Sequence, residues 1–411
     1  MNETSTENEF VNPWENRSLF PEVSKKHTIL AALICLLCSA GLPLCGNVWI
    51  APVLMLLLCG YVAYAARSPF TILLILLTAF SAMMFGMGFG GVAAILALIA
   101  GSMTLAYLFT TLKMAYLALL LPIAGFAVAF AVTRDWRVSL FSFSFLPAGL
   151  LLSLATVKGK NRTSAICFAE VGFLISVLVL IAFLIYDATG GLGRGQILAY
   201  INGIRDGITQ EFLSVRDEFL KIAAEVSNEQ SKAVAEMFAS MFSEDVVAQI
   251  FNLLPAVTVV VCSILAFESQ LLLGVTYFNT GLSALLPREA RIFTMSVTAA
   301  VLYTLSFLVM LFAPTTSMAV AVIQNVCLIL LPGFAILGVQ SLVMTIARAR
   351  GAMRVLFVFL VFAMLCCSGG GLYLLAMWGA YCRVMEALQR KLTEKLKQMR
   401  GDDSDGEDKE D

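Results

Sequence analysis

The sequence predicts an all-α fold: a polytopic bundle of 10–11 transmembrane helices with an amphipathic helical insertion. Three observations support this fold class. Eleven apolar segments, separated by charged or glycine-rich breaks and by one polar insertion, fill the chain from Thr28 to Tyr381. Hydrophobic residues make up 60% and charged residues 13% of the chain, against roughly 25% charged residues in soluble domains. Lysines and arginines also gather in loops on one side of the expected membrane.

Each apolar segment is read as a membrane helix, because about 20 apolar residues cross the hydrocarbon core with every backbone group bonded internally. The expected spans are 28–46, 48–66, 70–85, 89–110, 114–133, 138–157, 165–186, 251–279, 292–313, 317–346 and 355–381. Span 70–85 is short, so a re-entrant or broken helix is the alternative there. The chain thus divides into a polar tail (1–27), membrane helices 1–7 (28–186), an insertion (187–250), helices 8–11 (251–382) and a C-terminal tail (383–411).

The basic residues orient the bundle, since short cytoplasmic loops carry an excess of Lys and Arg. With the N-terminus inside, only Arg134 and Arg137 fall in the opposite short loops. The cytoplasmic side collects Arg17, Lys25, Lys26, Arg67, Lys113, Lys158, Lys160, Arg162, Arg288, Arg291, Arg348, Arg350 and Arg354. The basic tail also looks cytoplasmic, although one crossing separates it from Arg354. A hairpin at 368–371 in the last span would resolve this conflict, which stays open.

The insertion at 187–250 carries apolar residues at steps of three and four, the pattern of an amphipathic helix. This stripe comprises Ile197, Ile201, Ile204, Ile208, Phe212, Val215, Phe219, Ile222 and Val226. A turn with a capping box is expected at 227–230, followed by a second helix with Val234, Phe238, Met241 and Phe242. Ten acids against five bases make the insertion acidic, and the orientation places it outside. We expect its stripe to be covered by the second helix, the membrane or a partner.

The two ends of the chain are polar. No cleavable signal peptide is apparent, so the first apolar segment is expected to stay as a membrane anchor. Residues 383–400 read as a basic helix that lies against anionic headgroups, and 401–411 as an acidic disordered run. The expected location is the cell membrane, as a multi-pass protein.

Enzyme motifs are missing from the sequence. His27 is the single histidine, which excludes histidine-based metal sites and triads. Cys35 and Cys38 have redox spacing but lie in an apolar helix, where thiols act as small hydrophobes. The glycine-rich run at 190–195 lacks the strand and the lysine of a phosphate loop, and reads as an exit from the seventh span. We expect no enzyme activity, no cofactor, no metal and no nucleic-acid partner.

Two acids lie within apolar segments, where an ionisable side chain is costly and is a functional candidate. At 1.5 Å per residue, Glu170 lies about 8 Å from the cytoplasmic end of its helix, and Glu268 lies about 26 Å from the outer end of its span. Both acids are therefore expected near the cytoplasmic side. They are candidates for proton or substrate binding. The alternative is that they pair with the basic residues at 158–162 or 288–291.

The tenth span combines polar residues with a helix breaker. Gln324 and Asn325 precede Pro332 by two turns and Gln340 follows. Because Pro332 leaves a backbone carbonyl unpaired, a broken helix lining a ligand cavity is one reading. A packing kink with Asn325 bonded to a neighbouring helix is the other.

The fourth span contains a ridge of small residues, namely Ala93, Ala97 and Gly101. Such a ridge serves either internal packing or the docking of a membrane partner.

The C-terminal part of the chain resembles the YybS-like family of uncharacterised bacterial integral membrane proteins. The resemblance runs through NLLPAVTVVVCSILAFESQLLL from Asn252, LLPREARIF from Leu285, the stretch from Asn325 through LLPGFAILGVQSLVMTIARARG, and GGLYLLAMWGAYCR. The family usually ends with an acidic residue after the last glycine, which Gly379-Ala-Tyr-Cys382 lacks. Pro52, Arg67, the run at 86–91 and Gly101 look like the opening of substrate-binding subunits of energy-coupling-factor importers.

This resemblance implies a transport-related subunit that binds a small molecule between helices and docks on a membrane partner. The alternative is an envelope or sporulation-associated membrane protein that acts through protein contacts of its insertion. The lipid bilayer is a partner in both. The sequence names no substrate.

Overall fold

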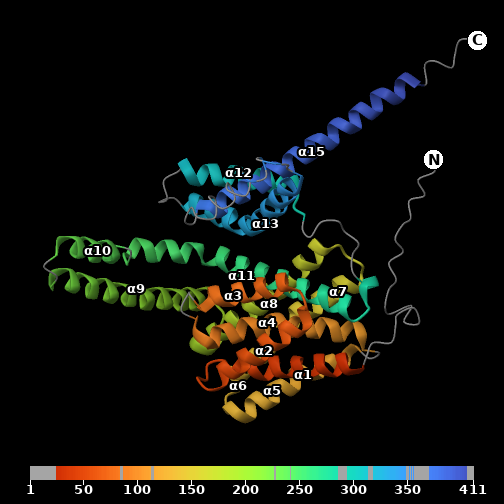
Figure 1. Cartoon of the computed structure of the whole chain (residues 1–411). Coiled ribbons are helices and arrows are strands. Elements are labelled where there is room, and N and C mark those ends of the chain that lie inside the picture. The colour runs from red at the N-terminus through yellow and green to blue at the C-terminus, as the bar shows by residue number, and fades with distance from the viewer. Residues whose placement is uncertain are drawn as a thin grey trace, which may run out of the picture. The chain divides into compact units, whose positions relative to one another are not determined.

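The computed structural model describes residues 25–83, 87–112, 115–225, 228–240, 242–285, 294–312, 318–348 and 370–404, together with 351, 353 and 355. Helices dominate these residues, and no strand occurs among them (Figure 1). The all-α prediction is therefore confirmed. The chain forms two compact units: unit 1 contains 1–202 and 261–292, and unit 2 contains 203–260 and 293–411.

Unit 1 is built around helix α4, Gly88–Thr111, whose residues from Ile99 to Leu108 are all buried. The other helices of this unit are α1 (Lys25–Gly41), α2 (Ile50–Ala66), α3 (Pro69–Ala82), α5 (Leu120–Thr133), α6 (Trp136–Ser139), α7 (Leu146–Val157) and α8 (Arg162–Thr189). Of these, α1, α2, α3 and α7 pack directly against α4. Short 3-10 turns lie at Leu42–Leu44, Ala115–Leu119, Leu140–Phe143 and Ser283–Leu285. The second half of α11, Glu244–Asn279, completes the unit.

Small residues allow the helices of unit 1 to approach closely. Ala93 and Ala97 are fully buried, and a side chain on Gly101 would overlap the ring of Phe145. A Cβ on Gly172 would likewise overlap the backbone of Ala148, where α8 crosses α7. The expected small-residue ridge is thus used for internal packing, as small residues are in other membrane bundles.

Capping residues set the ends of the long helices. The Asn161 side chain accepts a hydrogen bond from Ser164 N at 2.8 Å and starts α8, as N-cap residues do. Gly190, with φ of 75°, ends α8 in the left-handed conformation, a position that favours glycine. The glycine-rich run at 190–195 therefore serves as a helix exit, as the sequence predicted.

Unit 2 contains the helical hairpin expected from the insertion. Helix α9, Arg194–Glu225, begins in unit 1 and continues into unit 2, where α10, Glu229–Ser240, runs beside it (Figure 1). The ring of Phe219 stacks on those of Phe238 and Phe242 at centroid distances of 5.7 and 5.8 Å. In the turn, Asn228 accepts a hydrogen bond from Gln230 N at 3.0 Å. The second helix therefore covers part of the predicted stripe, while Ile201 and Ile204 are exposed.

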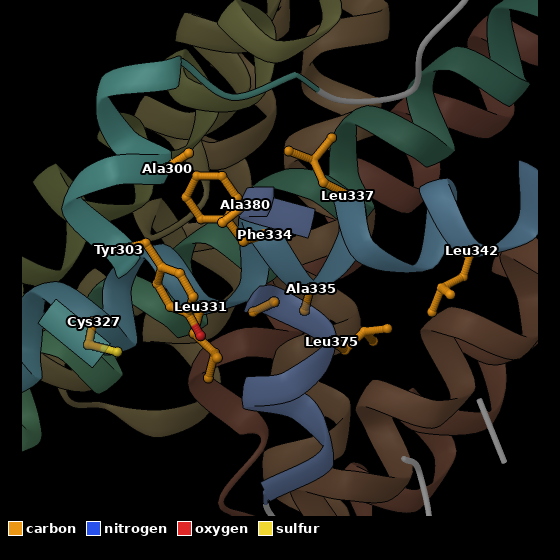
Figure 2. Close-up of a cluster of buried hydrophobic side chains, with 11 residues drawn as sticks. Ala300, Tyr303, Cys327, Leu331, Phe334, Ala335, Leu337, Leu342, Leu375 and Ala380 are labelled. Atoms are coloured by element: carbon orange, nitrogen blue, oxygen red, sulfur yellow. The ribbon is translucent and has the colours of Figure 1, made fainter. Parts of the chain in front are cut away.

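The rest of unit 2 packs α12 (Val297–Phe312), α13 (Met318–Arg348) and α15 (Gly370–Ser404) against one another. Figure 2 shows their shared core, in which the rings of Tyr303 and Phe334 lie 5.3 Å apart. A Cβ on Gly338 would overlap the carbonyl of Leu375, and one on Gly379 would overlap that of Phe334. These two glycines therefore let the backbones of α13 and α15 meet.

Seven helices in the described part of the chain are long and apolar enough to cross a membrane. They begin at Lys25, Gly88, Tyr116, Trp136, Arg162, Glu244 and Ala319. Two shorter apolar helices, Ile50–Ala66 and Val297–Phe312, also match predicted spans. Helix α3 has 14 residues, which agrees with the short third span. The first half of the last predicted span and its hairpin at 368–371 fall largely outside the described residues.

Other expectations also fall outside the described residues. These are most of the 1–27 tail, part of the break at 86–91, the cap at Ser227, Arg288 and Arg291, and residues 405–411. The beginning of the acidic run differs from its prediction, because α15 continues without a break from the last span through the basic helix to Ser404. Helix α13 is continuous through Pro332, so of the two alternatives for this span the broken helix is not observed.

Candidate functional site

Three consecutive polar residues of α11 lie buried inside unit 1. Glu268, Ser269 and Gln270 are exposed by only 1%, 0% and 6%. Successive residues of an α-helix point about 100° apart, so these three side chains reach different neighbours. This group on α11 is the most deeply buried polar segment among the described residues that also contains a carboxyl group.

Only one of the two carboxyl oxygens of Glu268 accepts a hydrogen bond in the described structure. The hydroxyl of Thr78, on α3, donates a hydrogen bond to Oε1 of Glu268. Its second oxygen, Oε2, is buried and has no hydrogen-bond partner in the described structure. A buried ionised carboxylate is costly unless it is paired with a cation or coordinates one. A proton, a metal cation or a cationic group of a ligand would complete this site.

Hydroxyl pairs hold α11 in place against the central helix α4. Ser102 donates to Ser269 over 2.8 Å, and the hydroxyls of Thr110 and Tyr277 are 2.7 Å apart. Both pairs join residues 167 positions apart in the chain. The two helices therefore run in the same direction, and the hydroxyl pairs fix the register that sets Glu268 beside Thr78.

Glu170 lies on α8 and is half-buried. The hydroxyl of Ser263, on α11, donates to its Oε1 over 2.7 Å. Neither Glu170 nor Glu268 forms an ion pair within the described residues. The partners seen for the two acids are thus hydroxyl groups rather than the basic residues at 158–162.

The remaining predicted site residues belong to unit 2. Asn325 on α13 uses its whole carboxamide in contacts with helix backbone. Its Oδ1 accepts from Ala256 N at 3.0 Å, and its Nδ2 donates to Asn252 O at 2.7 Å and to Ala321 O at 2.8 Å. Ala256 and Asn252 flank Pro255 within α11. This arrangement matches the packing alternative for Asn325.

The two glutamines of α13 have different environments. Gln324 is half-buried. The Oε1 of Gln340 is buried and has no hydrogen-bond partner among the described residues. The five predicted site residues are therefore divided, with Glu170 and Glu268 in unit 1 and the three amide residues in unit 2. Their roles in ligand binding remain predictions.

Sequence reasoning missed Thr78, Ser102 and Ser269, because single hydroxyl residues in apolar helices carry no distinctive pattern. Their partners lie 167 or 190 positions away in the chain, so only the fold reveals the pairing. Cys35 and Cys38 have free, buried thiols in α1. No group of three His, Cys, Asp or Glu side chains suited to a metal ion occurs in the described part of the chain.

The helical units with their apolar spans define a polytopic α-helical membrane protein. The model of one protein family matches residues 137–379, which make up more than half of the chain. The protein belongs to this family, described as predicted membrane protein (DUF2232). No curated protein and no solved structure matches the chain.

Proposed function

We propose that this protein is a transport-related membrane subunit that binds a small cationic solute, or a coupling cation, at Glu268. The observation that carries the proposal is the buried, partnerless Oε2 of Glu268 within a bundle of membrane helices. Intramembrane carboxyl groups in such positions commonly mark substrate or ion pathways. The resemblance to importer subunits supports the same function class.

The surroundings of Glu268 support a cation rather than an anion. Thr78 donates one hydrogen bond to the carboxyl group, and no basic side chain pairs with it among the described residues. An incoming cation would supply the missing charge, whereas an anion would be repelled. The proposal assigns no enzymatic activity, since the sequence offers a single histidine and no catalytic motif.

A thermal-unfolding screen of the full-length protein in detergent tests the proposal. The probes are sodium and potassium ions, primary amines, guanidinium compounds and quaternary ammonium compounds. A ligand present at 100 times its Kd stabilises the folded state by about 2.7 kcal/mol. We expect at least one probe to stabilise the wild type, and this stabilisation to be lost in Glu268→Gln. That variant keeps the shape of the side chain and removes its charge.

The matched control is Glu170→Gln, which neutralises the other intramembrane glutamate. Glu170 is more accessible than Glu268, and in the described structure it has no buried oxygen that lacks a partner, so this variant should keep the response to the probe. Equal stabilisation of all three proteins would refute a role for Glu268. The absence of any response in the wild type would refute cation binding.

A protein-contact function remains the second candidate because the α9–α10 hairpin exposes apolar side chains. Ile201, Ile204 and Met237 are 44%, 42% and 51% exposed. Such residues mark interaction surfaces when they gather in one place. Photo-crosslinking from position 204 in intact cells would test this candidate, and a specific protein adduct that survives in Glu268→Gln would favour it.

A further inference from the structure

Unit 1 contains a second polar feature, a cleft of about 350 Å³ at the ends of α2 and α11. Its walls come from the α2–α3 junction, the start of α8 and the last turns of α11. Its polar lining residues are Arg67, Ser68, Arg162, Gln270 and Asn279. Two arginines and no acid appear in this lining, which therefore favours an anion.

Arg67 is held at the mouth of this cleft by an uncommon backbone conformation. It ends α2 with φ of 43°, in the left-handed region that few non-glycine residues adopt. Its guanidinium group lies 5.4 Å from the centre of the Tyr64 ring, in the range of a cation–π contact. No carboxylate pairs with Arg67 in the described structure.

The other polar groups of the cleft also suit an anion. Arg162 is the first residue of α8, and Ser68 directly precedes α3. Backbone N–H groups at such helix starts favour negative charge. Gln270 is more than nine-tenths buried and lines the cleft. Its amide NH₂ group is a donor that a bound anion could accept from.

The geometry of the cleft is fixed by a contact between the helix ends. Nδ2 of Asn279, the last residue of α11, donates a hydrogen bond to the carbonyl of Ala65 over 2.9 Å. This bond satisfies a carbonyl at the C-terminal end of α2, which lacks a partner within its own helix. It also keeps the wall formed by α11 beside Arg67.

One wall of the cleft is apolar and continues along the membrane helix. Leu271, Val275 and Phe278 lie on one face of α11, since they are spaced by four and three residues. Phe278 is 71% exposed. From Phe278 to Leu271 this wall extends about 10 Å along the helix axis. A ligand here would meet basic groups at one end and an apolar surface at the other.

We propose that this cleft binds the phosphate group of an anionic phospholipid. Arg67 and Gln270 would hold the phosphate oxygens, Arg162 would add positive charge, and an acyl chain would lie along Leu271 and Phe278. Basic pockets between membrane helices on the cytoplasmic side bind lipid headgroups in this way, and the basic-residue bias predicts that Arg67 and Arg162 are cytoplasmic. The inference does not rest on Glu268, which bonds to α3 rather than lining the cleft.

The test uses full-length protein incubated with vesicles of phosphatidylcholine, with or without phosphatidylglycerol. Native mass spectrometry then measures the lipid that remains bound after extraction. The wild type should retain phosphatidylglycerol in preference to phosphatidylcholine. The variant Arg67→Asn, in which asparagine tolerates the left-handed backbone, should bind phosphatidylglycerol roughly fivefold less tightly, the effect of one basic residue. Arg67→Lys keeps the charge and should retain most of the preference.

Arg134→Asn is a matched control, because Arg134 also ends a helix in the left-handed conformation, with φ of 56°. It is predicted to lie at the opposite membrane face and should leave lipid binding unchanged. Equal retention of both lipids by the wild type, or equal losses in the two asparagine variants, would overturn the proposal. Equal unfolding temperatures of the variants in phosphatidylcholine vesicles would show that any difference does not arise from misfolding.

A second arm separates a lipid from a water-soluble phosphate ligand. Excess inorganic phosphate or glycerol phosphate should leave the bound phosphatidylglycerol in place, because neither compound contacts the apolar wall. If these compounds displace the lipid completely from the wild type, and displace less of it from Arg67→Asn, the ligand is a soluble phosphate compound. That result would overturn the assignment to a lipid.

Discussion

The strongest test of the packing in unit 2 is the substitution Asn325→Leu. In the wild type, the Asn325 carboxamide accepts a hydrogen bond from Ala256 N and donates one to Asn252 O. In a regular α-helix this N–H group and this carbonyl would bond to each other. Pro255 lies between them and distorts this turn of α11. Asn325 thus offers, from α13, a hydrogen-bond partner to each of these two groups in the turn that contains Pro255.

The expected cost follows from the number of bonds lost. Leucine has nearly the same shape as asparagine but can form neither bond to α11. Hydrogen bonds between membrane helices contribute about 0.6 kcal/mol on average and up to about 1.7 kcal/mol. Loss of two bonds should therefore lower the free energy of unfolding by about 1–3 kcal/mol, measured by titration with sodium dodecyl sulfate in mixed micelles and followed by circular dichroism.

A double-mutant cycle with Pro255→Ala makes this test specific. Alanine at 255 should allow Ala256 N to bond to Asn252 O directly, so Asn325→Leu should cost much less in that background. We expect a coupling energy of at least about 1 kcal/mol, well above the few tenths found for independent sites. Additive effects would refute the reasoning, as would an Asn325→Leu protein with wild-type stability.

Two further predictions concern helix contacts in unit 2. Gly379→Ala should destabilise the protein by about 1–3 kcal/mol in the same titration, because its methyl group would overlap the carbonyl of Phe334. Gly370→Ala is the control, since no atom of the described residues lies within 4 Å of a Cβ at that position. Equal effects of the two substitutions would exclude close packing as the cause. Phe219→Ala should lower the free energy of local opening of the hairpin by about 1–2 kcal/mol, less than for a fully buried ring, as measured by hydrogen exchange of residues 203–240. Leu220→Ala, at a 44% exposed position, should change it by less than about 0.5 kcal/mol, and similar exchange in both variants would contradict the stacking seen around Phe219.

Hydropathy predicted most helices to within a few residues, because each apolar segment must satisfy its own backbone in the membrane. The amphipathic period likewise predicted the α9–α10 hairpin. Some of the ends that differed are set by local caps that hydropathy does not report. Helix α11, for example, begins at Glu244, seven positions before the apolar run, after Ser243 accepts a hydrogen bond from Val246 N.

The polar contacts were less predictable, because they join distant parts of the chain. The sequence pointed to Glu268 and Asn325 as unusual residues in apolar segments, but it gave no means to find Thr78 or Ala256 as their partners. It also drew attention to Pro332 near Asn325. The structure instead joins Asn325 to the neighbours of Pro255, on a helix whose proline lies 70 positions earlier in the chain.

The short helix α3 illustrates how contacts can decide what hydropathy leaves open. Helices α4 and α11 run in the same direction, and α2 ends beside the end of α11 through the bond from Asn279 to Ala65. At the other end, Gly90 near the start of α4 lies against Cys45, just before α2. Helices α2 and α4 are therefore parallel, and α3 must carry the chain back from the end of one to the start of the other. With 14 residues, α3 is about 21 Å long and covers most of this return. This geometry favours a full crossing over a re-entrant segment at 70–85, and it agrees with the alternating directions that the basic residues predict for the first four spans.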